Sequence, residues 1–140
     1  MTTRNKIWAL ATFIGVFLVN IFPSQASNQK VYAFDCGFPE VKPESFTIYC
    51  ADAGEGIAQI TWITWSRKEA TGLGTYYSNP CEPNCAESKL IKRPVSLKLL
   101  GLKKMESKWI YTKLRFQSIA GPLPGRSSNS FTWVLIQEKI

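Results

Sequence analysis

Four cysteines constrain the fold of this chain more than any other feature. The chain has 140 residues, and its cysteines are Cys36, Cys50, Cys81 and Cys85. In a small exported chain an even number of cysteines normally forms disulfides, and chain order favours the pairs Cys36–Cys50 and Cys81–Cys85. Zinc is the alternative, but structural zinc sites usually use two short-spaced cysteine pairs, and only one such pair is present. We therefore predict two disulfides, no metal site and no cofactor.

The N-terminus has the pattern of a secretory signal peptide. Arg4 and Lys6 precede an apolar run over residues 7–22, which is followed by the small residues Ser24 and Ala26 at the two positions that a signal peptidase reads. Export to an oxidising compartment agrees with the predicted disulfides.

Cleavage after this site predicts a signal peptide of residues 1–26 and a secreted β-domain of residues 27–140. The apolar run has 16 residues, fewer than the ~20 that span the hydrocarbon core of a bilayer. An uncleaved membrane anchor is the alternative. That anchor is the only membrane contact we expect.

The remainder of the chain alternates apolar and polar residues in short segments. Five segments have strand-like alternation, at residues 45–50, 57–65, 95–99, 109–119 and 131–136. Turn signals separate them, including Gly72-Leu73-Gly74 and the Gly- and Pro-rich residues 121–125. No stretch has a convincing helical period. These patterns predict an all-β fold, a small disulfide-stapled antiparallel sandwich or partial barrel.

Basic residues are concentrated in the second half of the chain. Residues 27–88 contain four basic and eight acidic side chains, whereas residues 89–126 contain ten basic side chains and one acidic side chain. Such a segment is typical of an anionic partner, in this case an envelope component or a protein. We expect no nucleic-acid partner, because no nucleic-acid-binding motif accompanies the lysines. Solvated strand faces are the simpler alternative.

The alternation of residues along a strand predicts that the basic side chains of this segment lie on one face of the sheet. Tyr111, Lys113 and Arg115 should point away from Leu114 and Phe116. The adjoining turn is expected to extend that face with three lysines, Lys103, Lys104 and Lys108.

The composition leaves few routes to catalysis, and we assign no catalytic residue. The chain has no histidine, which removes the usual general base and the Ser-His-Asp arrangement. Carboxylates or a Ser–Lys pair remain, and Asp35, Asp52 and Glu55 lie near predicted turns. Two carboxylates across a cleft could hydrolyse a glycosidic bond. Asp52, which precedes Ala53-Gly54, is explained more simply as a turn cap.

Trp62 and Trp65 form the other candidate site. Residues three apart on a regular strand face opposite sides of the sheet, so we expect one tryptophan in the core and one at the surface. A surface tryptophan near the Gly72-Leu73-Gly74 turn could stack on a sugar ring. Packing in the core, for example against a disulfide, is the alternative.

The order of several short motifs resembles that of a family of small secreted actinobacterial proteins of unknown function. The motifs are C-A-D-A at 50–53, W-x-x-W at 62–65, G-x-G-T at 72–75, C-x-P-x-C-A at 81–86, P-V-x-L at 94–97 and T-W at 132–133. The sequence departs from the family pattern at Arg67, where a glycine is expected, and in the lysine-rich residues 103–113. The resemblance implies export, paired cysteines and a β-fold. It implies no activity.

Two functions from different classes are compatible with these observations. The favoured prediction is a secreted, non-catalytic binding module for an envelope, anionic or protein partner. Its candidate binding residues are Asp52, Trp62, Trp65, Lys113 and Arg115. The alternative is a small carboxylate-dependent hydrolase such as a glycosidase.

Overall fold

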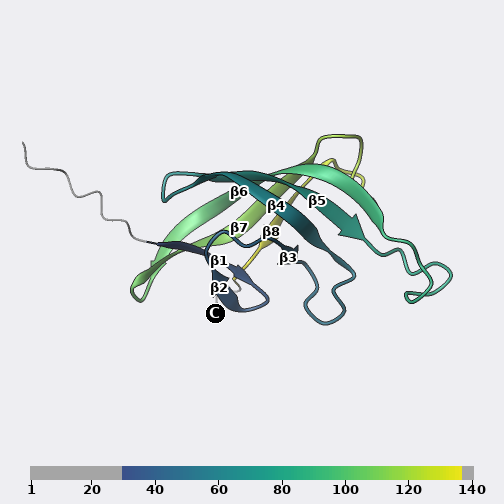
Figure 1. Ribbon diagram of the computed structural model, residues 1–140, viewed down its shortest axis with the longest axis horizontal. Coiled ribbons are helices and arrows are strands. Elements are labelled where there is room, and N and C mark those ends of the chain that lie inside the picture. The colour runs from purple at the N-terminus through teal and green to yellow at the C-terminus, as the bar shows by residue number, and fades with distance from the viewer. Residues whose placement is uncertain (1–29, 137–140) are drawn as a thin grey trace, which may run out of the picture.

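One curled sheet makes up the part of the chain that the computed structural model describes, residues 30–136 (Figure 1). The signal peptide predicted at residues 1–26 lies outside the described residues. The strands are β1 (Val31–Asp35), β2 (Phe38–Glu40), β3 (Phe46–Thr47), β4 (Glu55–Trp65), β5 (Ala70–Ser78), β6 (Ile91–Met105), β7 (Lys108–Ser118) and β8 (Ser130–Val134). Their order is β2-β1-β7-β6-β5-β4-β3, and β8 pairs with β7. The predicted all-β, disulfide-stapled fold is confirmed, and of its two predicted forms, sandwich and partial barrel, the structure has the partial barrel. The sheet is mixed rather than purely antiparallel, because β1 and β7 run parallel.

Alternation in β6 and β7 divides the sheet into an inner and an outer face. The inner face carries the buried side chains Val95, Leu97, Leu99, Leu114 and Phe116, and the exposed Lys98, Lys113 and Arg115 alternate with them on the outer face. Burying one face of an antiparallel sheet and solvating the other is the arrangement that period-2 alternation predicts. Tyr76 of β5, Phe46 of β3 and Leu123 of the loop after β7 complete the core.

Two β-bulges in β4 interrupt this alternation. Ala58 pairs with Thr75 and Thr61 with Leu73, so β4 has one residue more than β5 over this stretch. A second extra residue, Ile63, follows Trp62. A bulge bends its strand and increases the local twist, which helps a sheet to curl.

Gly72 and Gly74 lie inside β5, so the turn predicted at Gly72-Leu73-Gly74 is wrong. A Cβ on Gly72 would lie 2.8 Å from the Thr61 carbonyl oxygen, and one on Gly74 would lie 2.9 Å from Ile57 Cγ2. These glycines permit the close approach of β4 rather than a reversal of the chain.

Alternation is interrupted again where Gly101 of β6 faces Thr112 of β7. Gly101 has a φ of 67°, and the hydroxyl of Thr112 donates to its carbonyl at 2.8 Å. Leu102 and Tyr111, which pair just beyond this point, pack on the same core as Leu114. The prediction that Tyr111 shares the exposed face of Lys113 is therefore wrong. The irregular backbone at Gly101 interrupts the alternation, and beyond it the side chain of Tyr111 lies in the core.

Several strand boundaries also differ from the sequence prediction. The segment predicted at 45–50 is a strand only at Phe46–Thr47, because a turn follows in which the Ala53 N–H donates to the Tyr49 carbonyl at 2.9 Å. Strand β6 is 15 residues long and includes Lys103 and Lys104, so the prediction that they lie in a turn is wrong. Lys108 begins β7.

The two ends of the strand order are joined to each other. Cys36, after β1, is disulfide-bonded to Cys50, after β3, with the two Cα atoms 5.6 Å apart. Beside this bond, the Thr47 N–H donates to Asp35 Oδ1 at 2.8 Å. The labels of β1, β2 and β3 accordingly lie close together in Figure 1, although four strands separate β1 from β3 in the order. The disulfide therefore holds the sheet in its curled form.

Candidate functional site

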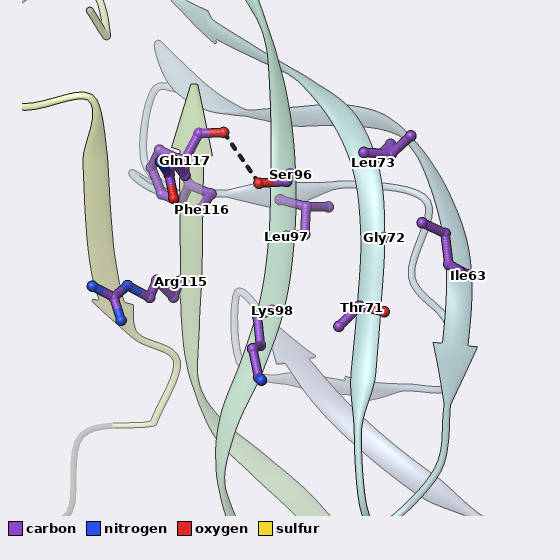
Figure 2. A pocket seen from close by; sticks show the side chains of 10 residues that line it. All are labelled: Ile63, Thr71, Gly72, Leu73, Ser96, Leu97, Lys98, Arg115, Phe116 and Gln117. Atoms are coloured by element: carbon purple, nitrogen blue, oxygen red, sulfur yellow. Dashed lines mark hydrogen bonds between the residues drawn. The ribbon is translucent and has the colours of Figure 1, made fainter. Parts of the chain in front are cut away.

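An open hollow on the outer face is the best candidate for a binding site. Its volume is about 490 Å³, and it crosses β4, β5, β6 and β7 (Figure 2). One side of the hollow is lined by the cations Lys98 and Arg115, and the other side is lined by the exposed aliphatic side chains Ile63 and Leu73. A larger hollow, about 620 Å³, follows the loop after β7, and its lining contains no charged side chain.

Strand register brings the two cations of the hollow together. Lys98 of β6 and Arg115 of β7 are direct cross-strand partners, and both are exposed. The carboxylate of Glu69 lies 3.6 Å from Lys98 Nζ, and both side chains are about half exposed. An ion pair this exposed contributes little to stability, so it competes only weakly with an outside anion.

The predicted orientation of Lys113 and Arg115 is correct. Both are exposed, and the residue between them, Leu114, is fully buried. Lys113 lies two residues from Arg115 and opposite Leu100, next to the hollow rather than in its lining. Lys103 and Lys104 are adjacent in one strand, so their side chains do not extend a single face as predicted.

Hydroxyl and amide side chains lie between the cations and the aliphatic side of the hollow. They are Thr71 of β5, Ser96 of β6 and Gln117 of β7. None of the three is among the binding residues predicted from the sequence. Ser96 and Gln117 could have been found from the sequence, because each alternates with apolar residues that are buried. Thr71 could not, because the glycines of β5 made that segment look like a turn rather than a strand.

Trp62 and Trp65 lie together at the inner face, and neither forms the predicted surface site. Their ring centroids are 4.6 Å apart, and both pack against the core. The bulge at Ile63 is the reason, because it places Trp62 opposite Gly72 and Trp65 opposite Ala70, two positions on one face of β5. The structure therefore has the alternative arrangement, in which both tryptophans pack on the core.

Both indole N–H groups donate to main-chain carbonyls of other segments. Trp62 donates to Pro43 at 2.9 Å, and Trp65 donates to Val31 of β1 at 3.2 Å. The second bond links β4 to β1, two strands that are not neighbours in the sheet and that the curl brings close together. The tryptophans thus stabilise the curl by packing and by hydrogen bonding.

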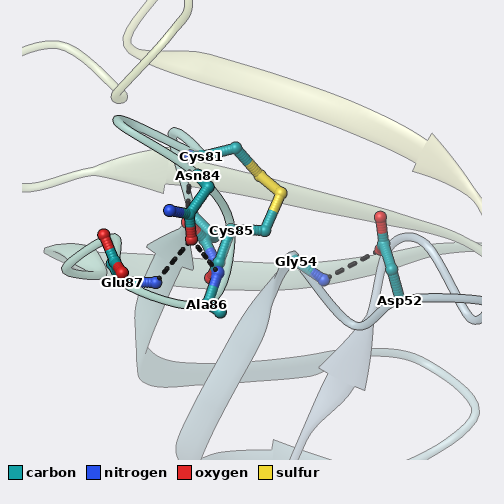
Figure 3. Close-up of a disulfide and its surroundings, with 8 residues drawn as sticks. Asp52, Gly54, Cys81, Asn84, Cys85, Ala86 and Glu87 are labelled. Carbon is teal, nitrogen blue, oxygen red and sulfur yellow. Dashed lines mark hydrogen bonds between the residues drawn. A yellow bond between two sulfur atoms is a disulfide. The ribbon is translucent and has the colours of Figure 1, made fainter.

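Two of the three candidate carboxylates are engaged in local structure. Asp52 Oδ1 accepts the Gly54 N–H at 3.0 Å, which is the predicted turn cap (Figure 3). Glu55 Oε1 accepts the Tyr76 hydroxyl and an Arg126 guanidinium N–H, each at 2.5 Å. Burial, together with the hydrogen bond to Glu55, raises the pKa of Tyr76 to about 12. Glu55 therefore ties the loop after β7 to the core.

Asp35 is the third carboxylate, and it accepts the Thr47 N–H beside the Cys36–Cys50 disulfide. Burial raises the pKa of Asp35, although the hydrogen bond from Thr47 opposes the shift. The folded chain therefore holds this proton more tightly than the unfolded chain. Its contribution to stability is present at low pH and is lost as the pH rises through the folded-state pKa.

Asp35→Asn should unfold at the same urea concentration as the wild type at pH 7, or a higher one. The amide keeps an oxygen for the Thr47 N–H but has no charge to bury. Any gain should shrink as the pH falls through the raised pKa of Asp35, because the wild-type carboxyl then takes up a proton and has no charge to bury either. Asp35→Ala is the control, and it should lose about 1 kcal/mol because Thr47 loses its acceptor. Equal losses in the two variants would contradict this assignment.

The second disulfide closes a small loop beyond the sheet. Cys81 and Cys85 are bonded to each other (Figure 3), so both predicted pairs are confirmed, the zinc alternative is excluded and no cysteine is free. Within this loop Asn84 Oδ1 accepts the N–H groups of Ala86 and Glu87. Two disulfides indicate an oxidising compartment.

Comparisons with known proteins give no functional assignment. No protein-family model, curated protein or solved structure matches this chain. Over residues 30–136 there is no helix long and apolar enough to cross a membrane. In the same part of the chain, no three His, Cys, Asp or Glu side chains are grouped so that they could hold a metal ion.

Proposed function

We propose that this chain is a secreted, non-catalytic binding module whose ligand is an anionic envelope component or an acidic protein. The observation that carries the proposal is the hollow on the outer face, where Lys98 and Arg115 are cross-strand partners on neighbouring strands. Lys113, two residues from Arg115, adds a third exposed cation to the same face.

The surroundings of these cations favour an outside partner. Arg115 lies opposite Thr132 on β8 and Lys98 lies opposite Thr71 on β5, so the cross-strand neighbours of the pair are uncharged. The carboxylate of Glu69, which pairs with Lys98, is about half exposed and holds it weakly. Attraction of an anion to such a patch requires neither a deep cleft nor a catalytic group. By contrast, no observation favours the hydrolase alternative, because Asp35, Asp52 and Glu55 each have the structural partner described above.

The predicted location supports the same proposal. A signal peptide at residues 1–26 would export the chain, and the resemblance to small secreted actinobacterial proteins points the same way. Anionic polymers, anionic lipids and acidic proteins are the partners that a basic surface meets outside the cytoplasm.

Reversing the charge of the cation pair should weaken binding at least tenfold. The test measures the affinity of the exported, disulfide-bonded protein for polygalacturonate, poly-L-glutamate and phosphatidylglycerol vesicles over a salt series. Lys98→Glu/Arg115→Glu should lose affinity for whichever of these the wild type binds. Wild-type binding should itself weaken as salt rises, because the Debye length is only ~8 Å at physiological ionic strength.

Lys89→Glu/Lys92→Glu is the matched control, because it changes the net charge by the same amount on exposed residues. Lys92 lies six residues before Lys98 along β6, about 20 Å away at the rise of an extended strand. This control should keep most of its affinity. Equal losses in both variants would mean that net charge, and not this surface, attracts the ligand. Failure of the wild type to bind any of the three probes would overturn the proposal.

A further inference from the structure

The hollow has the shape and chemistry to select one class among the anions. We infer that its ligand is an acidic polysaccharide, a chain of carboxylated sugars that lies across strands β4 to β7. This inference rests on the proposed function and goes beyond it by naming the ligand class. Four features of the hollow carry it: its extent, the spread of its cations, its hydroxyl groups and its aliphatic end.

The hollow is extended in the direction across the strands. Its lining runs from Ile63 on β4 to Arg115 on β7, which covers three interstrand spacings, or about 14 Å. A single phosphate or carboxylate would contact a small fraction of this surface. A ligand that uses the whole hollow must be an elongated molecule.

The two cations do not converge on a single point. Figure 2 shows Arg115 extending from β7 toward β8, whereas Lys98 extends along β6. Cations arranged in this way cannot clamp one anion between them. They fit successive negative groups on one chain, as in a polymer that carries a charge on each repeating unit.

Between the cations and the aliphatic end, the hollow offers hydrogen-bonding side chains. Ser96 and Gln117 lie opposite each other on β6 and β7, and Thr71 lies beside Lys98 on β5. The Ser96 hydroxyl donates to the Gln117 carbonyl at 3.5 Å, and the Thr71 hydroxyl is hydrogen-bonded to that of Thr64 at 2.8 Å. A hydroxyl can form more than one hydrogen bond, so both keep capacity for a sugar hydroxyl, as does the side-chain amide of Gln117. Ile63, which the bulge turns outward, and Leu73 offer an apolar surface of the kind that covers the C–H face of a sugar ring. They are 66% and 46% exposed.

An acidic peptide fits this surface less well. Peptides that bind to a sheet by their main chain add a strand at an edge. The hollow instead lies over β5, β6 and β7, and each of these has strands on both sides. The main-chain N–H and C=O groups of these strands are therefore already hydrogen-bonded to neighbouring strands, and a ligand in the hollow can contact only side chains.

A membrane surface also fits less well. Binding to a bilayer interface uses apolar side chains that protrude into the headgroup region. Here the two exposed aliphatic side chains border a hollow, and Lys98, Arg115 and the hydroxyl groups occupy the rest of it.

The test compares four probes by titration calorimetry at one low salt concentration. They are polygalacturonate, its fully methyl-esterified form, poly-L-glutamate of matched charge and phosphatidylglycerol vesicles. We expect polygalacturonate to bind at least tenfold more tightly than each of the others. The ester keeps the sugar and loses the charge, whereas poly-L-glutamate keeps the carboxylates and loses the sugar.

A variant that keeps both cations separates the two contributions. Ser96→Ala/Gln117→Ala should weaken polygalacturonate binding about fivefold and leave poly-L-glutamate binding unchanged. Equal binding of polygalacturonate and poly-L-glutamate, or tighter binding of the vesicles, would overturn the polysaccharide inference and leave the proposed function standing. The absence of binding to every anionic probe would overturn both.

Discussion

Replacing Cys36 and Cys50 together by serine should lower the free energy of unfolding by about 2–5 kcal/mol. The bond closes a loop with a sequence separation of 14 residues, for which the chain-entropy relation gives ~3 kcal/mol. It also joins the two ends of the strand order, so its loss frees the β1–β2 hairpin and β3 to separate. Urea unfolding under non-reducing conditions measures the change.

Cys81→Ser/Cys85→Ser is the matched control for this prediction. Its bond spans four residues and lies in an exposed loop outside the sheet, so we expect a loss of at most about 2 kcal/mol. A loss in the control equal to that in Cys36→Ser/Cys50→Ser would contradict the role of the first bond in holding the curl.

Trp65→Ala should cost about 3 kcal/mol of stability, the lower end of the range for truncating a large aromatic side chain in a core. The ring is partly buried and packs on both Trp62 and Tyr111. The substitution also removes the hydrogen bond from β4 to the Val31 carbonyl of β1. Thermal or urea unfolding followed by circular dichroism gives the change.

Trp65→Phe distinguishes packing from hydrogen bonding at this position. Phenylalanine keeps an aromatic ring but has no N–H, so the expected cost is about 1 kcal/mol. If Trp65→Ala costs less than that, the tryptophan does not stabilise the curl. That result would favour the role predicted from the sequence, a surface tryptophan that stacks on a sugar ring.

Sequence patterns were sufficient where a strand is regular. Val95, Leu97 and Leu99 alternate with polar residues, and the structure buries them as the pattern predicts. Lys113 and Arg115 were placed correctly for the same reason. The cysteine pairs could be predicted as well, since chain order favoured them.

The same reasoning failed where a strand is irregular. Trp62 and Trp65 share a face because of the bulge at Ile63, and Tyr111 enters the core because of the irregularity at Gly101. A bulge is defined by pairing with another strand, so the sequence of β4 alone does not reveal it. Glycines in β5 had a similar effect, because a glycine that permits close packing cannot be distinguished locally from one that permits a turn.

By itself, the sequence determined the all-β class, the two disulfides, the basic second half and the outward face of Lys113 and Arg115. These depend on local alternation, composition and cysteine order. Only the tertiary structure decided that the sheet curls, that Cys36–Cys50 joins its ends, and that Lys98, Arg115, Thr71 and Ile63 line one hollow. Each of those facts depends on which residues pair across strands far apart in the chain. Strand register is set by packing of the whole sheet on its core, and no local pattern contains it.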